Sequence, residues 1–226
     1  MQDMAKAFEN IRVLDLSDRL SGAWADRLFG NFGAYVILVE DKQGHPLRRE
    51  PPFLSDEPGV ENSLLHAYVS SNTRFVPVED SELRELFETS AVVVTSCIYL
   101  PDELEFLPSI SIHLSITPHG LDGPIAHLPG NNLTACAKSG WCAINQCIDH
   151  EPLQLHHNQS GYISGFAGFA RASTALFHSL RTGNGELVDD SEDEALANTC
   201  TPWAEVRLFI GGNNQQSPSY SFEGLI

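Results

Sequence analysis

The sequence is short of positive charge. Its 226 residues contain 13 Lys and Arg against 30 Asp and Glu, which gives a formal net charge of −17. Such a chain is repelled by phosphate backbones and by anionic lipid surfaces. We therefore expect no nucleic-acid partner and no membrane partner. A polyanionic ligand is expected only where local basic residues offset the charge.

The cysteine pattern and the apolar runs exclude further classes. The chain has five cysteines, none of them in a CxxC pair, and the spacing among Cys136, Cys142 and Cys147 fits no common zinc site. The opening residues, MQDMAKAFENIRVLDL, lack the segments of a signal peptide. The longest apolar stretch, Gly161 to Leu180, is broken by charged and small residues and suits a buried helix better than a membrane span. We expect a cytoplasmic protein with reduced thiols, no metal centre and no covalently bound cofactor.

What is present is an alternation of strand-like and helix-like segments. Apolar, β-branched runs predict strands, and apolar residues at helical spacing predict helices. Strands are predicted at residues 11–17, 35–40, 74–78, 91–95 and 111–117, and helices at 21–32 and 81–89. Ser21 is a possible N-cap of the first helix, and Gly33 is a natural residue to end it. This order predicts an α/β fold: a doubly wound, Rossmann-like parallel sheet with helices on both faces.

The second half of the chain has a different composition. Residues 119–160 are rich in Gly, Asn, Pro and His and predict a substrate-facing loop region with a short helix at Leu133–Lys138. Beyond them we predict a long helix at 161–181 ended by TGNG, a short strand at 187–188 and a helix at 194–210 that Pro202 kinks or splits. We expect an α/β domain at residues 1–190, followed at 191–226 by a helical linker and a flexible tail.

Several motifs add more than a generic pattern. They are VLDLS at residues 13–17, SGA at 21–23, GAYVILVE at 33–40, GHPLR at 44–48, NTR at 72–74, ITPHGLDGP at 116–124 and RTGNGELVD at 181–189. In this order and at these distances they resemble the amino-terminal portion of the class III CoA-transferases, the CaiB/BaiF family. The resemblance covers about residues 11–212. Members are longer: their chain continues into a small second domain and then returns to the first, and two subunits interlock.

The resemblance implies a CoA-transferase activity, but the residue that this activity needs is absent at the matching position. The family moves CoA between carboxylic acids through an aspartate nucleophile, which begins a long helix in a D-x-x-x-G pattern. Here the glycine of that pattern falls on Gly165 and the aspartate position falls on Gly161, and no Asp or Glu occurs between Leu153 and Phe166. No catalytic residue is therefore predicted, and the chain is interpreted as a pseudoenzyme.

A racemase branch of the family uses a histidine in a G-H-D motif as a proton carrier. That histidine is absent too, because the matching stretch is Gly130-Asn131-Asn132. His127, His156 and His157 lie nearby in the sequence, but loop histidines are more often structural or solvated than catalytic.

The CoA-binding positions that the resemblance implies are only partly kept. Arg48 and Arg74 remain as possible phosphate contacts, and the Ser21-Gly22 turn at a helix N-terminus could approach a phosphate. Against this, both arginines could be surface salt-bridge partners, and Gly22 could simply allow a tight turn. Other family positions are changed and now carry Asp41, Thr73, Ser96 and Leu104. Acyl-CoA or CoA is the ligand that the resemblance implies.

The strand after TGNG also departs from the family. It reads V-D-V-S there, whereas Asp190 takes the place of the second apolar residue here. A buried, unpaired carboxylate is costly, so this strand is expected to be short, frayed or at a sheet edge.

These observations leave three interpretations open. The chain could be a non-catalytic or degenerate half of a larger or tandem CoA-transferase. It could be an active acyl-CoA transferase or 2-methylacyl-CoA racemase whose catalytic group is displaced, for example to His157 or Asp149. It could instead be a non-enzymatic binding or assembly module. The resemblance implies a homodimer, or a second transferase-like half, as the protein partner.

Overall fold

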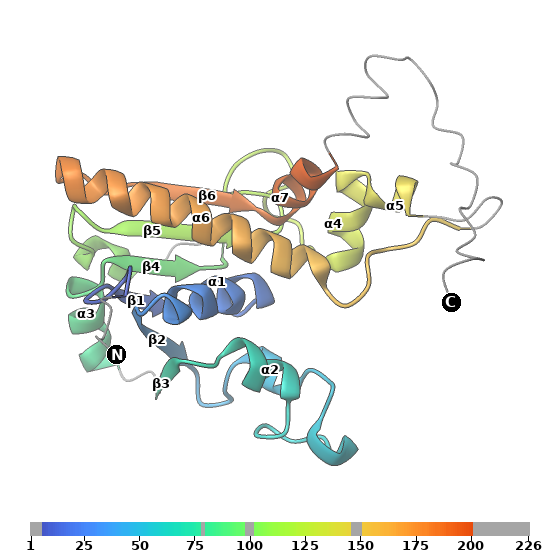
Figure 1. Cartoon of the computed structure of the whole chain (residues 1–226), viewed down its shortest axis with the longest axis horizontal. Coiled ribbons are helices and arrows are strands. Elements are labelled where there is room, and N and C mark those ends of the chain that lie inside the picture. Colours follow the sequence, from blue (N-terminus) through green and yellow to red (C-terminus); the bar gives the residue numbers. More distant parts are fainter. Residues whose placement is uncertain (1–5, 78–79, 98–101, 146–150, 201–226) are drawn as a thin grey trace.

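A parallel sheet organises the chain. The computed structural model describes residues 6–77, 80–97, 102–145 and 151–200. Its strands are β1 (Arg12–Asp15), β2 (Tyr35–Glu40), β3 (Thr73–Pro77), β4 (Val92–Thr95), β5 (Ile112–Thr117) and β6 (Leu187–Ser191). They form one six-stranded sheet in the order β3-β2-β1-β4-β5-β6, and every neighbouring pair is parallel (Figure 1). The predicted doubly wound α/β fold is confirmed.

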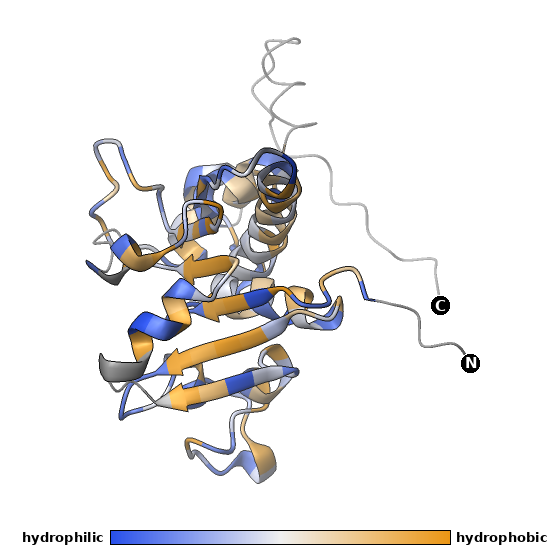
Figure 2. Cartoon of the chain, turned by 90° about the vertical axis from the view of Figure 1, so that its left-hand side faces the viewer, coloured by the Kyte–Doolittle hydropathy of each residue, from blue (hydrophilic) through white to orange (hydrophobic). Residues whose placement is uncertain are grey.

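Helices cover both faces of this sheet. On one face, α1 (Leu20–Asn31) and α6 (Gln159–Thr182) pack on a core of strand residues that includes Val13, Val94 and Ile116. On the other face, α3 (Asp80–Glu88) and a 3₁₀ turn at Asp102–Phe106 pack on Leu14, Val93 and their neighbours. The central strands β1, β2 and β4 are mostly apolar because both faces of the sheet are covered there, and Figure 2 shows strands drawn mainly in orange.

Two glycines end helices as predicted, but Ser21 does not cap the first helix. Gly33 and Gly183 both adopt positive φ, at 101° and 80°, just beyond α1 and α6. Ser21 is not the N-cap of α1. The helix begins at Leu20 with Arg19 as the capping residue, and the Ser21 hydroxyl is used elsewhere.

The short elements in the connection between β2 and β3 were not predicted. Helix α2 (Leu64–Val69) begins at Ser63, whose side chain accepts a hydrogen bond of 3.1 Å from the His66 N–H. The loop before it contains 3₁₀ turns at Pro46–Arg49 and Leu54–Asp56. The predicted short helix at 133–138 is α4 (Asn132–Ser139), and a further turn, α5 (Trp141–Ile144), follows it.

The last described helix, α7 (Glu192–Thr199), packs against α4 and α6 at the carboxyl end of the sheet. The predicted helix at 194–210 extends beyond the described residues, and the predicted tail lies wholly outside them. The division of the chain at residue 190 stays a prediction.

Strand β6 lies at one edge of the sheet, which was one of the expected alternatives for the strand that contains Asp190. Asp190 is fully buried, and its carboxylate forms an ion pair with Arg171 of α6. The chain therefore accommodates a carboxylate in an apolar position by placing a cation on the helix that covers it.

Within the described residues, no helix is both long and apolar enough to cross a membrane. In the same part of the chain, no group of three or more His, Cys, Asp or Glu side chains is placed to hold a metal ion.

Candidate functional site

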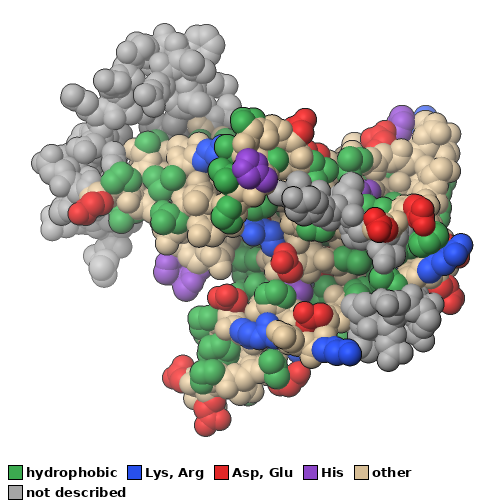
Figure 3. All heavy atoms as spheres, turned by 180° about the vertical axis from the view of Figure 1, so that it is seen from behind, with side chains coloured by type: hydrophobic (Ala, Val, Ile, Leu, Met, Phe, Trp, Pro, Cys, Tyr) green, Lys and Arg blue, Asp and Glu red, His purple; other side chains and the backbone are tan. Residues whose placement is uncertain are grey.

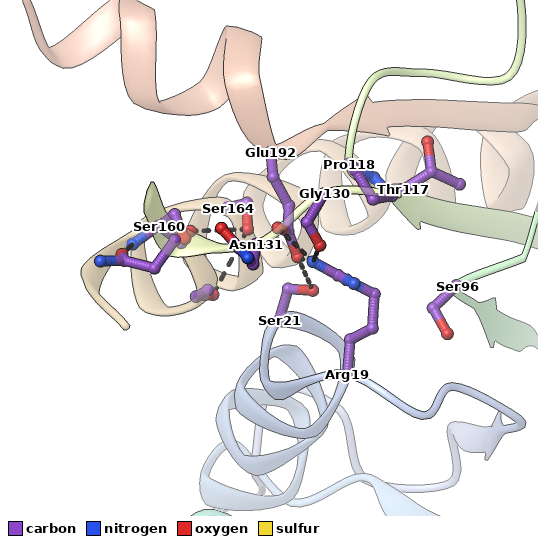
Figure 4. Close-up of polar contacts among 12 residues, drawn as sticks. Arg19, Ser21, Ser96, Thr117, Pro118, Gly130, Asn131, Ser160, Ser164 and Glu192 are labelled. Atoms are coloured by element: carbon purple, nitrogen blue, oxygen red, sulfur yellow. Dashed lines mark hydrogen bonds and ion pairs between the residues drawn. The ribbon is translucent and has the colours of Figure 1, made fainter. Parts of the chain in front are cut away.

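The candidate site lies where the carboxyl ends of the strands meet the first turns of α1, α6 and α7 (Figure 4). Connections leave β1 and β4 in opposite directions along the sheet, and open α/β sheets bind ligands in the crevice at that point. Here a polar bridge spans the loops after the two strands. The Ser96 hydroxyl donates to Asp18 Oδ1 at 2.6 Å, and the Asp18 N–H donates to Ser96 Oγ at 2.9 Å. A phosphate in this crevice would meet the negative charge of Asp18.

The centre of the site is an ion pair between α7 and the start of α1. Arg19 Nε and Nη2 donate to the two carboxylate oxygens of Glu192 at 2.9 and 2.7 Å. The Ser21 hydroxyl donates to Glu192 Oε1 at 2.8 Å, and Arg19 also donates to the Gly130 carbonyl at 3.2 Å (Figure 4). Burial alone would lower the pKa of Arg19, but the hydrogen bond to Glu192 and its charge raise that pKa above its ordinary value. The cationic form of Arg19 is therefore held in place by hydrogen bonds to Glu192.

Ser21 and Gly22, the predicted phosphate-binding turn, lie side by side in the first turn of α1. Ser21 is fully buried and its hydroxyl is already bonded to Glu192. A Cβ on Gly22 would overlap the Ser17 side chain, so this position needs glycine for the close approach of the preceding loop.

Arg48 lies near the carboxyl end of β2 and is nearly buried. Its Nε and Nη2 donate to the Glu40 carboxylate at 2.8 and 3.1 Å, and its Nη1 donates to Glu61 at 3.2 Å. Burial opposes ionisation of Glu40, yet the Arg48 hydrogen bonds and charge hold the Glu40 pKa below its ordinary value. A phosphate would have to compete with two carboxylates for this guanidinium.

Arg74 lies away from Ser21, Gly22 and Arg48, the other residues predicted to bind CoA. It lies near the start of β3, and its guanidinium is 4.1 Å from the centre of the ring of Tyr35, the first residue of β2. In a parallel sheet these positions mark the amino edge, opposite the site. The role of Ser21, Gly22, Arg48 and Arg74 in binding CoA stays a prediction.

Gly161, the position at which the resemblance predicts an aspartate, lies at a contact between α6 and the start of α1. Gly161 lies in the first turn of α6, where an added Cβ would be 3.1 Å from three atoms of the Leu20 side chain. One turn later, a Cβ on Gly165 would be 3.0 Å from Trp24 Cβ and closer still to the Ser21 carbonyl. The start of α6 is held from the other side by Asn132, whose side-chain oxygen accepts from the Ser160 N–H at 3.1 Å.

A pocket of about 480 Å³ opens beside this turn, between α2 and the start of α6. Leu20, Leu64, Tyr68 and Tyr162 contribute apolar surface, and Glu50, Asn132, Gln154, His157 and Asn158 contribute polar groups. His157 and Asn158 both have positive φ, at 48° and 49°, which is uncommon for residues other than glycine. Asp149, the other group considered for a displaced role, lies outside the described residues.

A second polar cluster is centred on Asp193, the residue that follows Glu192 in α7. Asp193 Oδ2 is 2.5 Å from His119 Nδ1 and 2.6 Å from Lys138 Nζ, and the Asp193 side chain is 4% exposed. Most cations around the site thus face a carboxylate of the same chain. On the face of the molecule seen in Figure 3, Lys and Arg side chains are scattered among Asp and Glu.

Sequence reasoning missed Arg19, Glu192 and Asp193 as site residues. The available signal was the acidic run at 189–194 directly after a predicted strand, because carboxylates there lie at the carboxyl edge of the sheet and need cationic partners.

Comparison with known proteins gives consistent results. The model of "CoA-transferase family III" matches residues 8–96 and 103–222. The chain is 33% identical over 218 residues to the "Succinyl-CoA:(R)-benzylsuccinate CoA-transferase subunit BbsE" of Thauera aromatica, covering 88% of this chain and 53% of the relative. It is 27% identical over 219 residues to the "Succinate--glutarate CoA-transferase" of Agrobacterium fabrum, covering 88% of this chain and 55% of the relative.

The solved structure of a CAIB/BAIF family protein from Brucella suis superimposes with a TM-score of 0.82 at 20% identity, covering 94% of this chain and 60% of that one. This likeness concerns the fold. The chain spans about half the length of the curated relatives it matches.

Proposed function

The chain belongs to CoA-transferase family III, and from this premise we propose that it is a non-catalytic or degenerate half of a larger or tandem CoA-transferase. In this proposal the chain supplies the sheet and the α1–α6–α7 framework, and a second transferase-like half or a second subunit supplies the nucleophile. Gly161 is the observation that carries the proposal. Its backbone packs against Leu20 at the place where the family has its aspartate, and glycine offers no nucleophilic atom.

The charge pairing around the site supports the same proposal. CoA carries several phosphate charges, which proteins neutralise with free Arg and Lys side chains. Here Arg48 is bonded to Glu40 and Glu61, and Arg19 is bonded to Glu192. Asp18 adds negative charge at the crevice itself. Both features weaken the binding of a polyanion.

The names of the relatives suggest a substrate class for the whole assembly. Both curated relatives described above are named for CoA transfer that involves succinate or succinyl-CoA together with a second dicarboxylic acid, and one of them is named as a subunit. We propose acyl-CoA and dicarboxylic acids as the substrates of an assembly that contains this chain.

Two measurements on the purified chain test the proposal. The first is titration of CoA by calorimetry at low and at moderate salt. The second is the exchange of isotopically labelled succinate into succinyl-CoA. We expect no exchange and, at most, weak CoA binding that disappears as salt rises, because the available cations are few and paired. Arg74→Gln is the control for overall charge: among the described residues Arg74 packs on the Tyr35 ring, so its replacement leaves no described carboxylate unpaired.

The Gly161→Asp variant separates two causes of inactivity. If only the nucleophile were missing, this variant would gain exchange activity; if the CoA site is lost as well, it stays inactive, as we expect. Label exchange by the unmodified chain would overturn the proposal. In that case loss of exchange in His157→Gln would identify a displaced group in the pocket, and unchanged exchange would exclude His157.

A further inference from the structure

Three hydrogen-bond donors of α1 and its cap converge on one carboxylate, and that carboxylate belongs to the chain itself. They are Arg19 Nε, Arg19 Nη2 and Ser21 Oγ, at 2.9, 2.7 and 2.8 Å from the oxygens of Glu192. We propose that Arg19 and Ser21 form a carboxylate-binding subsite, and that Glu192 fills this subsite as an internal ligand. The proposal does not depend on whether the chain takes part in CoA transfer.

The geometry is that of carboxylate recognition. A guanidinium offers two parallel N–H groups whose spacing matches the two oxygens of a carboxylate, and the additional hydroxyl fixes the orientation. The receiving groups are held independently of Glu192. Ser21 is fully buried within α1, and the Gly130 carbonyl accepts a further hydrogen bond from Arg19 Nη2 at 3.2 Å. The subsite is therefore preorganised by α1 and the Gly130 loop (Figure 4).

Glu192 comes to this subsite from a separate element. It is the first residue of α7 and lies 173 residues beyond Arg19 in the sequence. The Glu192 side chain is 3% exposed, whereas the Arg19 side chain is 24% exposed. A small solute can therefore reach the guanidinium from one side if the Glu192 carboxylate is removed.

The buried pair of Asp190 and Arg171 differs in this respect. Asp190 lies within β6, so its place is fixed by the sheet ladder. Glu192 follows the strand and depends only on how α7 packs. Of these two pairs, the Arg19 pair is the one whose carboxylate can be replaced without altering a strand.

The structure also specifies the size of the external ligand. Replacing Glu192 with alanine keeps Cβ and removes one methylene and the carboxylate, which together correspond to acetate. Replacing it with glycine removes one more carbon, which corresponds to propionate. The ligand class is therefore a small aliphatic monocarboxylate, or the end of a longer acid that presents the same group.

The experiment is thermal unfolding of Glu192→Ala in sodium acetate and in sodium chloride of equal ionic strength. We expect the variant to melt below the unmodified chain in chloride, because Arg19 and Ser21 lose their partner. Acetate should raise its melting temperature progressively with concentration, as expected for a ligand that binds only the folded state. The unmodified chain, whose subsite is filled, should melt at the same temperature in both salts. Glu192→Gly should respond more strongly to propionate than to acetate.

Two variants control this result. Glu194→Ala removes the same charge from the same helix turn at an exposed position, so acetate and chloride should act on it equally. Glu192→Gln fills the space with an amide, so acetate should not stabilise it. If Glu192→Ala does not fold in chloride, the yield of folded protein after refolding in acetate replaces the melting temperature, and a higher yield than in chloride is expected. Equal behaviour of Glu192→Ala in acetate and chloride, or an equal acetate effect on Glu194→Ala, would overturn the proposal.

Discussion

At the scale of single residues, the chain buries two carboxyl groups close together between β1 and α1. Asp15 and Asp26 are both nearly inaccessible, and Asp26 lies on α1 facing the end of β1. Burial, followed by the charge of Asp15 and the hydrogen bond with it, raises the pKa of Asp26 well above its ordinary value of 3.8. Folding therefore favours the protonated form of Asp26 over the ionised form.

Replacing Asp26 with Asn should stabilise the protein at neutral pH. A carboxyl group whose pKa is raised by folding costs nothing below its unfolded pKa, and its cost grows as the pH rises towards the folded pKa. The amide of Asn can still donate a hydrogen bond to Asp15, and it does not ionise as the pH rises. We expect a gain of about 1 kcal/mol, of the order of one buried hydrogen bond.

The measurement for Asp26→Asn is urea unfolding at a series of pH values from acidic to neutral. The gain should vanish near the unfolded pKa of 3.8 and increase with pH. Asp122→Asn, at an exposed position, should show no such dependence. A constant difference between Asp26→Asn and the unmodified chain at all pH values would contradict the ionisation argument.

Single residues were predictable from the sequence where their chemistry is local. Gly33 and Gly183 end helices because they follow an apolar periodic segment and accept positive φ. The partners of Arg48 and Ser21 were not predictable, because Glu61 and Glu192 reach them through tertiary folding. The same reason left Ser21 misassigned as an N-cap.

At the scale of elements, the contact between α1 and α6 determines the shape of the candidate site. Gly161 and Gly165 let the start of α6 lie directly on Leu20, Ser21 and Trp24. This close approach leaves the pocket beside the turn rather than within it. Backbone contact at glycine also leaves no space for a larger side chain unless a neighbour moves.

The Gly165→Ala change should destabilise the protein more than Gly161→Ala does. Alanine is the better helix former by about 1 kcal/mol, so packing has to outweigh this gain. At Gly165 the new methyl group meets the Ser21 carbonyl, which is backbone and cannot move alone, whereas at Gly161 it meets the flexible Leu20 side chain. We expect a loss of about 1–3 kcal/mol for Gly165→Ala and a smaller change for Gly161→Ala, measured by urea unfolding. The reverse order would show that Leu20 is the more rigid neighbour.

Strands were predictable at this scale and short helices were not. β1, β2 and β4 each contain a run of buried apolar residues, and β5 is fully buried with apolar residues in alternation. Helix α2 has only six residues between a polar loop and β3, and such a segment shows little periodicity. Ser63 before Leu64 was the one local signal for its start.

At the scale of the whole molecule, the excess of negative charge acts against compactness. Arg19, Arg48 and Lys138 are each paired with a carboxylate near the site, and the chain as a whole has a formal net charge of −17. The uncompensated carboxylates therefore lie mainly on the surface, where they repel one another.

Added salt should stabilise the folded chain at neutral pH. Screening weakens repulsion among exposed charges, whereas the buried pairs of Arg19 and Arg48 are screened less. We expect the melting temperature to rise by about 2–4 °C between low and physiological salt, which corresponds to about 1 kcal/mol for a chain of this size. Near the isoelectric point of 4.7, the same salt step should have a smaller effect. A melting temperature that falls with salt at neutral pH would mean that exposed ion pairs outweigh the repulsion.

The separation of Arg19 from Glu192 also matters while the protein is being synthesised. Because Glu192 lies 173 positions after Arg19, the six strands of the described sheet have been made before the ribosome adds Glu192. During that interval, Arg19 and Ser21 have no carboxylate from α7, so the contact that joins α7 to the start of α1 forms only after the whole sheet has been synthesised.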